Sequence, residues 1–392
     1  MENREIWLLH FSTFFFFLGY ILVSPLISPL AILYGASPLV VGTIASVSSI
    51  FALVLKPIGG ILGDRGKKFE VMMFGTILGA LAGVFYALSI VAKSLVLFTV
   101  GRAIHGAASA FFFPSSLSTA IDLAPKGRVG ETLGWRGTMF SISQLIGPAL
   151  GGFVADYLGF QSAFILTIFL SIIGFGFIFI PYRKQKGLIK IVHDKTKASY
   201  KGLINWAFAA ASFSLFFMVL AYSGLYTFLP AYYKVLGLGT SIFGVYASIM
   251  GAFSLLTRVF GGKQADKRGP IPVATVGLVL VIIAYVMLTR ALEPPLAYLS
   301  AVPLGMGFGL AVPSLQMLAL AKLPQKIRGF GSSLYTMFFD LGYLSGPLLL
   351  GYLANVRGTY AVVFPILPIL TAFALTSLQA ARMSPKEGPL KD

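Results

Sequence analysis

The chain has 392 residues, of which 57% are hydrophobic and only 11% are charged, with a mean hydropathy of +0.86. Soluble domains carry about 25% charged residues, so the composition excludes an ordinary soluble protein. The chain has no cysteine and no HExxH, GxSxG or GxxxxGK[ST] motif, which excludes disulfides, thiol catalysis and the commonest metal and phosphate sites. We therefore expect no enzyme, no cofactor and no metal.

Apolar segments follow one another along the whole chain, and each is long enough to cross a bilayer. We expect twelve spans, at 6–33, 38–63, 70–92, 95–121, 131–157, 160–182, 203–233, 238–262, 270–290, 294–321, 329–355 and 359–381. The first has early acids and no clear cleavage site after a short apolar core, so we expect a retained span and not a signal peptide. The pattern predicts an all-α polytopic membrane protein.

The net charge of +17 follows the predicted topology. Most lysines and arginines between the spans fall on the side that carries both termini, and the positive-inside rule places that side in the cytoplasm. This placement argues against nucleic acid as a partner. We expect a monomer in the lipid bilayer, in the plasma membrane of a prokaryote.

The longest polar segment, 183–202, divides the spans into two sets of six. It predicts an N-terminal six-helix bundle at 1–182, a cytoplasmic basic linker, and a C-terminal six-helix bundle at 203–392. The basic residues of the linker either follow the positive-inside rule or bind anionic lipid headgroups.

The two sets of spans repeat one another. Seven glycine and proline landmarks recur 199 residues later as the same residue types: Gly106, Pro114, Pro125, Gly130, Gly147, Pro148 and Gly152 become Gly305, Pro313, Pro324, Gly329, Gly346, Pro347 and Gly351. In the stretch "GGILGDRGKK" at 59–68, Gly60, Asp64 and Arg65 recur 202 residues later as Gly262, Asp266 and Lys267. The repeat predicts two pseudo-symmetric bundles.

With these motifs the chain resembles the major facilitator superfamily over about residues 6–381. In that family the connection from the second to the third helix carries G-x-x-x-D-[RK]-x-G-[RK]. The copy "GKQADKRG" at 262–269 matches it, and the copy at 60–68 is one residue short. The segment "GRAIHGAASA" is similar to the R-x-x-Q-G motif of proton-coupled members, with His105 in place of glutamine. The segment "GWRGTMFSISQLIGPALGG" is similar to a fifth-helix motif associated with antiporters.

The resemblance implies two bundles that rock about a midplane site and move a small-molecule solute by alternating access, with H+ as the coupling ion. It implies a cytoplasmic gate, closed by ion pairs between the halves, at Gly60, Asp64, Arg65, Gly262, Asp266 and Lys267. The helix-kink and packing residues are Gly147, Pro148, Gly151, Gly152, Gly346 and Pro347. These either only allow close packing or also help to close the cavity.

Charges inside spans are costly, at roughly 2.5–3.5 kcal/mol each, and need a partner or a wet cavity. Lys56 and Arg258 each stand eight residues before the repeated aspartate, which places both about 12 Å inside the membrane. Two cations at matching depth suit an anionic solute held between the halves, although each can also pair with a neighbour or snorkel. Arg136 either contacts the substrate or binds Glu131.

Aromatic residues gather at the end of the span at 203–233. Tyr222 and Tyr226 are expected to line the substrate cavity, and Tyr232 and Tyr233 to join the interfacial aromatic belt.

Asp340 is the only acid deep in a predicted span. It either couples transport to protons, with Lys56 as the partner that the resemblance implies, or forms a static buried ion pair. Arg102 and His105 share one helix face and are implied in proton coupling, although a neutral, hydrogen-bonded histidine is the alternative. Asp122, Glu131 and Asp156 lie near helix ends, where solvent or headgroups can serve them.

Three functions remain open. The four cations inside the spans favour a proton-coupled carrier of a small organic anion. The fifth-helix motif favours a proton-driven multidrug efflux antiporter, although an exporter of hydrophobic cations would need acids in its cavity. A membrane sensor or scaffold that does not transport is the third.

Overall fold

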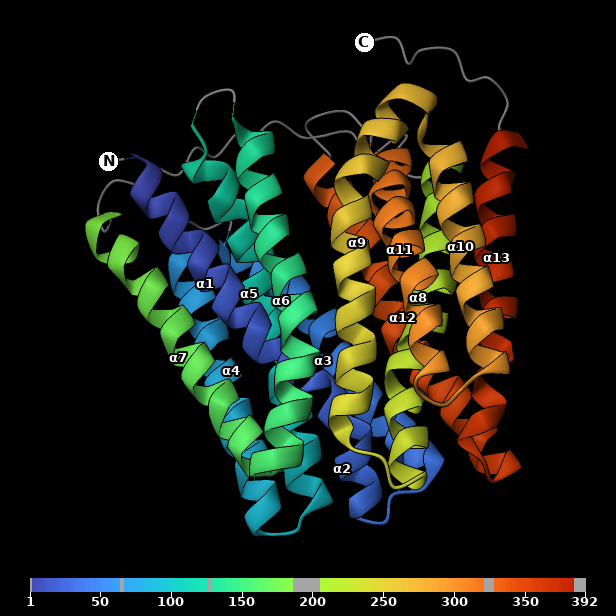
Figure 1. The fold of residues 1–392 in the computed structure, drawn as a ribbon. Helices are drawn as coiled ribbons and strands as arrows, with labels where there is room; N and C mark the ends of the chain where they lie inside the picture. Colours follow the sequence, from blue (N-terminus) through green and yellow to red (C-terminus); the bar gives the residue numbers. More distant parts are fainter. Residues whose placement is uncertain (1, 64–66, 126–127, 186–204, 321–327, 384–392) are drawn as a thin grey trace. The chain divides into compact units, whose positions relative to one another are not determined.

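The computed structural model describes residues 2–63, 67–125, 128–185, 205–320 and 328–383 (Figure 1). Within them, twelve helical segments are long and apolar enough to cross a membrane, which confirms the predicted spans. The chain is an all-α polytopic membrane protein. It folds into two compact units.

Unit 1 comprises residues 1–194, 226–251 and 347–360. The N-terminal residues of the sequence supply α1 (Glu2–Leu22), η1 (Ser24–Leu26), α2 (Ile27–Leu33), α3 (Pro38–Leu62), α4 (Lys68–Val91), α5 (Leu95–Leu123), α6 (Val129–Leu158) and α7 (Phe160–Gln185). Helix α4 packs against α5 and α7, α3 packs against α5, and α1 packs against α6 and α7. The core between them is aromatic, with the rings of Phe16 and Phe112 stacked at 3.8 Å.

Unit 2 comprises residues 195–225, 252–346 and 361–392. The remaining helices are α8 (Trp206–Val235), α9 (Thr240–Arg268), α10 (Pro270–Arg290), α11 (Leu296–Leu320), α12 (Arg328–Arg357), η4 (Tyr360–Val363), α13 (Ile366–Ala380) and η5 (Ala381–Met383). Helix α10 packs against α11 and α13. Because α8, α9 and α12 contribute to both units, the division of the chain at 183–202 stays a prediction.

Local signals set the helix boundaries. Helix α3 begins at Pro38 after Ser37, whose Oγ accepts a hydrogen bond from Val40 N at 3.4 Å. Helix α9 continues to Arg268, beyond the predicted end at 262. It ends there because Gly269 adopts a left-handed backbone, at φ 83°, and Pro270 follows it.

The repeat is visible in the backbone as well as in the sequence. Gly35 and Gly237 both turn the chain with positive φ, at 77° and 76°, and Gly159 and Gly358 do so at 85° and 67°. Their spacings equal those of the sequence repeat, and a left-handed backbone favours glycine. The same turns therefore recur in both halves.

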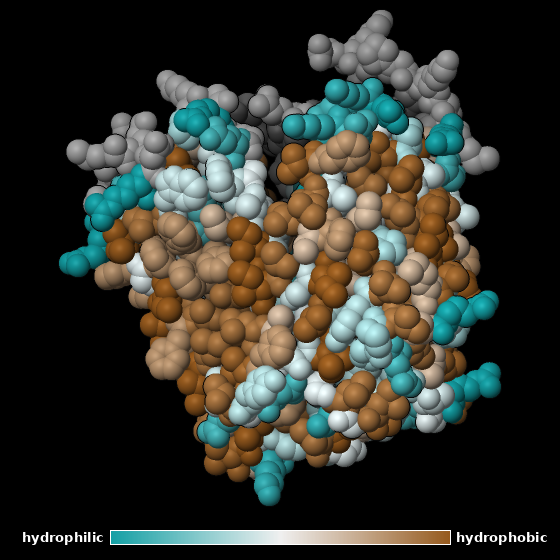
Figure 2. Space-filling model, in the orientation of Figure 1, coloured by the Kyte–Doolittle hydropathy of each residue, from teal (hydrophilic) through white to brown (hydrophobic). Residues whose placement is uncertain are grey.

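The outer surface of the helices is apolar. In the view of Figure 2, hydrophobic residues cover most of the surface, and most hydrophilic residues gather toward the helix ends. Large side chains such as Leu256 and Val54 are 70% and 64% exposed. In water such exposure would be unfavourable, whereas lipid tails cover it without cost.

Candidate functional site

Arg136 on α6 is buried among neutral oxygen atoms. Its side chain is 6% exposed. Nε and Nη2 donate hydrogen bonds to Ser116 Oγ at 3.2 and 2.7 Å, and Nη2 also donates to the Phe113 carbonyl oxygen at 3.2 Å. No hydrogen bond of Nη1 is present within the part of the chain that the structure describes, so this nitrogen keeps its capacity to donate.

The ring of Phe113 on α5 lies next to two cations. The Arg136 guanidinium carbon is 4.8 Å from the ring centroid, and Lys56 Nζ, from α3, is 5.8 Å from it. The face of an aromatic ring carries partial negative charge, which offsets part of the repulsion between the two cations. Lys56, Phe113, Ser116 and Arg136 are called the Phe113 cluster below.

Residue His10 on α1 adds a third basic side chain beside this cluster. It is 1% exposed, and neither ring nitrogen has a hydrogen-bond partner among the residues described. The indole rings of Trp7 and Trp135 meet at 5.0 Å and hold α1 against α6 next to Arg136. No role for His10 can be predicted from the sequence, because a lone histidine in a span carries no pattern.

Two of the predicted substrate-binding residues belong to unit 2. Arg258 lies half-buried on α9, where its backbone nitrogen approaches Gly309 of α11. Tyr222 is 3% exposed, and its ring packs against Phe308 at 4.6 Å and Tyr343 at 5.9 Å. The pairing of Lys56 with Arg258 joins the two units and stays a prediction.

The other tyrosines at the end of α8 belong to unit 1. The ring of Tyr226 meets Phe243 edge-on at 5.1 Å. Tyr233 is 1% exposed, so its assignment to the aromatic belt is wrong. It is packed inside the protein, because the helix turns this position away from lipid.

Arg102 and His105 lie where α5 meets α3 and α4. Arg102 Nη2 donates to the Ala45 carbonyl oxygen at 2.9 Å. The His105 Nδ1 and Tyr86 Oη atoms are hydrogen-bonded at 3.0 Å, and His105 is 2% exposed. A Cβ on Gly106 would overlap the Ser48 carbonyl oxygen, so α5 and α3 are in backbone contact here. A role of either side chain in proton coupling stays a prediction.

Asp340 is 7% exposed on α12, within unit 2. It is therefore buried, as expected of an acid deep in a span. Its predicted partner Lys56 belongs to unit 1, so this pairing also stays a prediction.

The predicted cytoplasmic gate is described only in part. Asp64 and Arg65 lie outside the described residues. Asp266 and Lys267 are exposed on the last turn of α9 and not in a loop. A Cβ placed on Gly60 or Gly262 would meet nothing within 4 Å, so neither glycine is in close contact here.

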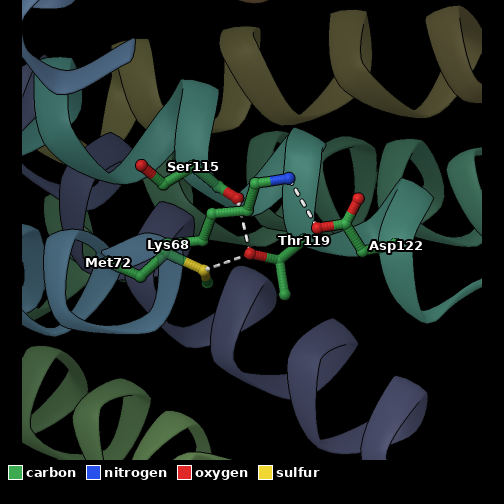
Figure 3. A network of polar contacts seen from close by, with 5 residues as sticks. All are labelled: Lys68, Met72, Ser115, Thr119 and Asp122. Carbon is green, nitrogen blue, oxygen red and sulfur yellow. Dashed lines mark hydrogen bonds and ion pairs between the residues drawn. The ribbon is translucent and has the colours of Figure 1, made fainter. Parts of the chain in front are cut away.

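An ion pair joins the start of α4 to the end of α5, close to the motif copy at 60–68. Figure 3 shows Lys68 Nζ of α4 beside Asp122 Oδ2 of α5, at 2.5 Å. In the same network Thr119 Oγ1 donates to the Ser115 carbonyl oxygen at 2.7 Å and contacts Met72 Sδ at 3.5 Å. Asp122 was expected to rely on solvent or headgroups, and it has a lysine partner instead.

Glu131 pairs with Arg128 and not with Arg136. Arg128 Nε and Nη2 reach the two Glu131 carboxylate oxygens at 2.6 and 2.7 Å. The alternative in which Arg136 binds Glu131 is therefore wrong. Arg128 lies three residues away at the exposed end of the helix, whereas Arg136 points into the protein.

The predicted packing residues are in close contact with neighbouring helices. On α6, a Cβ on Gly151 would overlap the Leu22 carbonyl oxygen, and Gly147 also packs on Leu22. On α12, Gly346 packs in the same way on Leu220 of α8. Each helix uses its glycine motif to approach the first helix of its own half.

Toward their ends, the same two motifs contact helices of the opposite half. A Cβ on Gly152 would lie 2.6 Å from Ser241 Cα of α9. A Cβ on Gly42 of α3 would overlap the Pro347 carbonyl oxygen of α12 and lie 3.3 Å from Gly351 Cα. All of these residues belong to unit 1. The motifs therefore pack within and between the sequence repeats.

Comparisons with known proteins agree with this architecture. A family model described as Major Facilitator Superfamily matches residues 9–347. An uncharacterised MFS-type transporter of Methanocaldococcus jannaschii is 24% identical over 91% of this chain and 92% of its own. The multidrug resistance protein MdtG of Salmonella arizonae is 24% identical over 88% of this chain and 86% of its own. The solved structure of a bacterial homologue of the human lysosomal transporter Spinster has a TM-score of 0.77 at 14% identity, covering 97% and 98% of the two chains.

Proposed function

The chain belongs to the Major Facilitator Superfamily and is a membrane transporter rather than an enzyme, and on this premise we propose that it carries a small organic anion. The observation that carries the proposal is the Phe113 cluster, in which Arg136 and Lys56 share one ring. Every hydrogen bond of Arg136 within the described residues ends on a neutral oxygen.

A buried guanidinium costs several kcal/mol unless an opposite charge or good hydrogen bonds compensate it. Ser116 and the Phe113 carbonyl oxygen compensate part of this cost and fix the orientation of the Arg136 fork. A carboxylate is the partner that such a planar fork binds best, with two parallel hydrogen bonds. Lys56 supplies a second charge and Phe113 an apolar surface, so a carboxylate with an apolar body fits the cluster.

The transport cycle that we propose is alternating access between two six-helix bundles, with both termini in the cytoplasm. Arg258, Tyr222 and Tyr226 complete the substrate contacts from the second half. Asp340 carries the coupling proton, and Arg102 and His105 modulate it. We keep the proposal that Asp64, Arg65, Asp266 and Lys267 form the cytoplasmic gate.

A second candidate is a proton-driven multidrug efflux antiporter. The similarity to MdtG of Salmonella arizonae and the glycine motif around Pro148 favour it. An exporter of hydrophobic cations needs acidic side chains where its substrate binds, whereas the Phe113 cluster presents cations. The chemistry of the cluster therefore favours the anion.

The test is a thermal-shift screen of the purified protein against carboxylates and lipophilic cations, since a ligand stabilises the state that it binds. We expect carboxylates to raise the unfolding temperature of the wild type, and Arg136→Gln to abolish the rise. Arg183→Gln is the matched control, because Arg183 also lies over a ring, that of Phe179 at 5.6 Å, but at an exposed helix end. Stabilisation by the cations alone would favour the efflux antiporter.

A further inference from the structure

The carboxylate of Asp156, near the end of α6, caps the start of α9. Oδ1 accepts a hydrogen bond from Thr240 N, and Oδ2 accepts one from Ser241 N, both at 2.7 Å. The first four N–H groups of a helix have no partner inside the helix, so one side chain here satisfies two of them. A negative charge is also favoured at this end by the helix dipole.

Helix α9 has no cap of its own at this position. The residue before Thr240 is Gly239, which has no side chain, and a Cβ there would lie 2.5 Å from Asp156 Oδ2. Glycine at 239 thus leaves the space that the incoming carboxylate fills. The start of α3 is different, because Ser37, at the position that corresponds to Gly239 in the first repeat, caps that helix.

Beyond the cap, α6 and α9 stay in close contact with each other. A Cβ on Gly244 would lie 2.5 Å from the Pro148 carbonyl oxygen. Further along, Ser248 Oγ donates a hydrogen bond to the Leu145 carbonyl oxygen at 2.5 Å. We call the contact of Asp156 with Thr240 and Ser241 the latch, and the contacts from Pro148 and Leu145 to α9 the seam.

The latch connects the two sequence repeats. Helix α6 belongs to the first repeat and α9 to the second, and both contacting segments lie in unit 1. The position equivalent to Asp156 in the second repeat is Asn355, so the repeated halves differ here by one charge. Packing alone does not require this difference, since Gly152 and Gly244 of this contact correspond to Gly351 and Gly42 in the contact between α12 and α3.

We propose that Asp156 is a gate residue, whose carboxylate holds the α6–α9 seam closed in one state of the transport cycle and releases α9 in the other. This inference rests on the alternating access of the proposed function, but not on the charge of the solute. Loss of the latch shifts the balance toward the state in which the seam is open. A cap that only stabilised the fold would leave this balance unchanged.

The chain has no cysteine, so Ser248→Cys gives a single reporter inside the seam. The experiment measures how fast a bulky maleimide labels the introduced thiol in the purified, solute-free, full-length protein. Asp156→Ala removes both acceptors, and we expect labelling to become about tenfold faster, in line with the loss of a strong helix cap. Asp156→Asn keeps one acceptor without the charge and gives a smaller increase.

Gly239→Ala is the second variant, because it keeps the carboxylate but blocks its place. We expect faster labelling here too. The control is Gly137→Ala on α6, where the added Cβ meets nothing within 4 Å and labelling should stay at the reference rate. Unchanged labelling in Asp156→Ala and Gly239→Ala, even with a lower unfolding temperature, would reduce Asp156 to a static cap and overturn the proposal. A carrier of cations would give the same labelling result, so this test is independent of the thermal-shift screen.

Discussion

Replacing Phe113 by leucine removes the aromatic face but leaves Arg136 and Lys56 in place. A cation over a ring contributes about 0.5–1 kcal/mol when exposed and about 2 kcal/mol when desolvated. Arg136 is 6% exposed and lies 4.8 Å from the ring centroid, so we count it as desolvated. Lys56 is half-buried and lies 5.8 Å from the centroid, so we count it as exposed. The ring should therefore stabilise the two cations by about 2.5–3 kcal/mol in total.

The loss of ring volume must be separated from the loss of the cation contacts. Phe140 on α6 is the matched control, since it is also half-buried and also meets the ring of Phe17 edge-on, at 4.8 Å against 5.8 Å for Phe113. No cation lies over Phe140 among the residues described. Phe140→Leu therefore reports the cost of a smaller side chain alone.

The assay is a double-mutant cycle on the free energy of unfolding, measured by titrating the protein in mild-detergent micelles with sodium dodecyl sulfate. We expect Phe113→Leu and Arg136→Gln to be coupled by about 1–2 kcal/mol, because each removes the same ring–cation contact. Phe140→Leu and Arg136→Gln should be additive to within about 0.5 kcal/mol. Equal coupling in both cycles would refute the idea that Phe113 holds the cations.

Three further predictions concern other parts of the chain. Gly106→Ala should lower the free energy of unfolding by about 1–3 kcal/mol, because its Cβ would overlap the Ser48 carbonyl oxygen, while Gly137→Ala stays at or above the wild-type value. Asp340→Asn should abolish transport driven by a proton gradient and leave exchange of solute for solute intact; persistent driven transport would exclude Asp340 as the proton carrier. Asp122→Asn should cost less than about 1 kcal/mol, because the Asp122 side chain is 51% exposed, and the loss should vanish in high salt. A larger, salt-independent loss would show that the pair with Lys68 is not an ordinary surface ion pair.

The spans could be predicted from the sequence because lipid makes the same demand on each segment separately. The repeat could be predicted because its glycines and prolines recur at a fixed spacing. A segment must be apolar and long enough, and it ends where glycine and proline stop a helix. Gly35 and Gly237 repeat for the same reason, since each turn needs a left-handed residue. The end of α9 was misplaced because all residues from 263 to 268 except Ala265 are polar, while the stop signal lies at Gly269.

The contacts within the site depended on tertiary placement. Lys56 and Arg136 were found because a charge in a span is costly and therefore conspicuous. Phe113 was missed, since one phenylalanine in the run "FFF" is no different from its neighbours until α3 and α6 pack against it. The capping of α9 by Asp156 could not be predicted, because a carboxylate at a helix end usually meets solvent, and its partner N–H groups lie far away in the sequence.

The central claim, that the Phe113 cluster binds an anionic solute for transport, is tested most directly by counterflow in proteoliposomes. Liposomes preloaded with an unlabelled carboxylate that the thermal-shift screen identifies are diluted into its labelled form. No ion gradient is required, so the result does not depend on the coupling ion. We predict transient accumulation of label by the wild type and by Arg183→Gln, and none by Arg136→Gln. Equal accumulation by wild type and Arg136→Gln would contradict the claim.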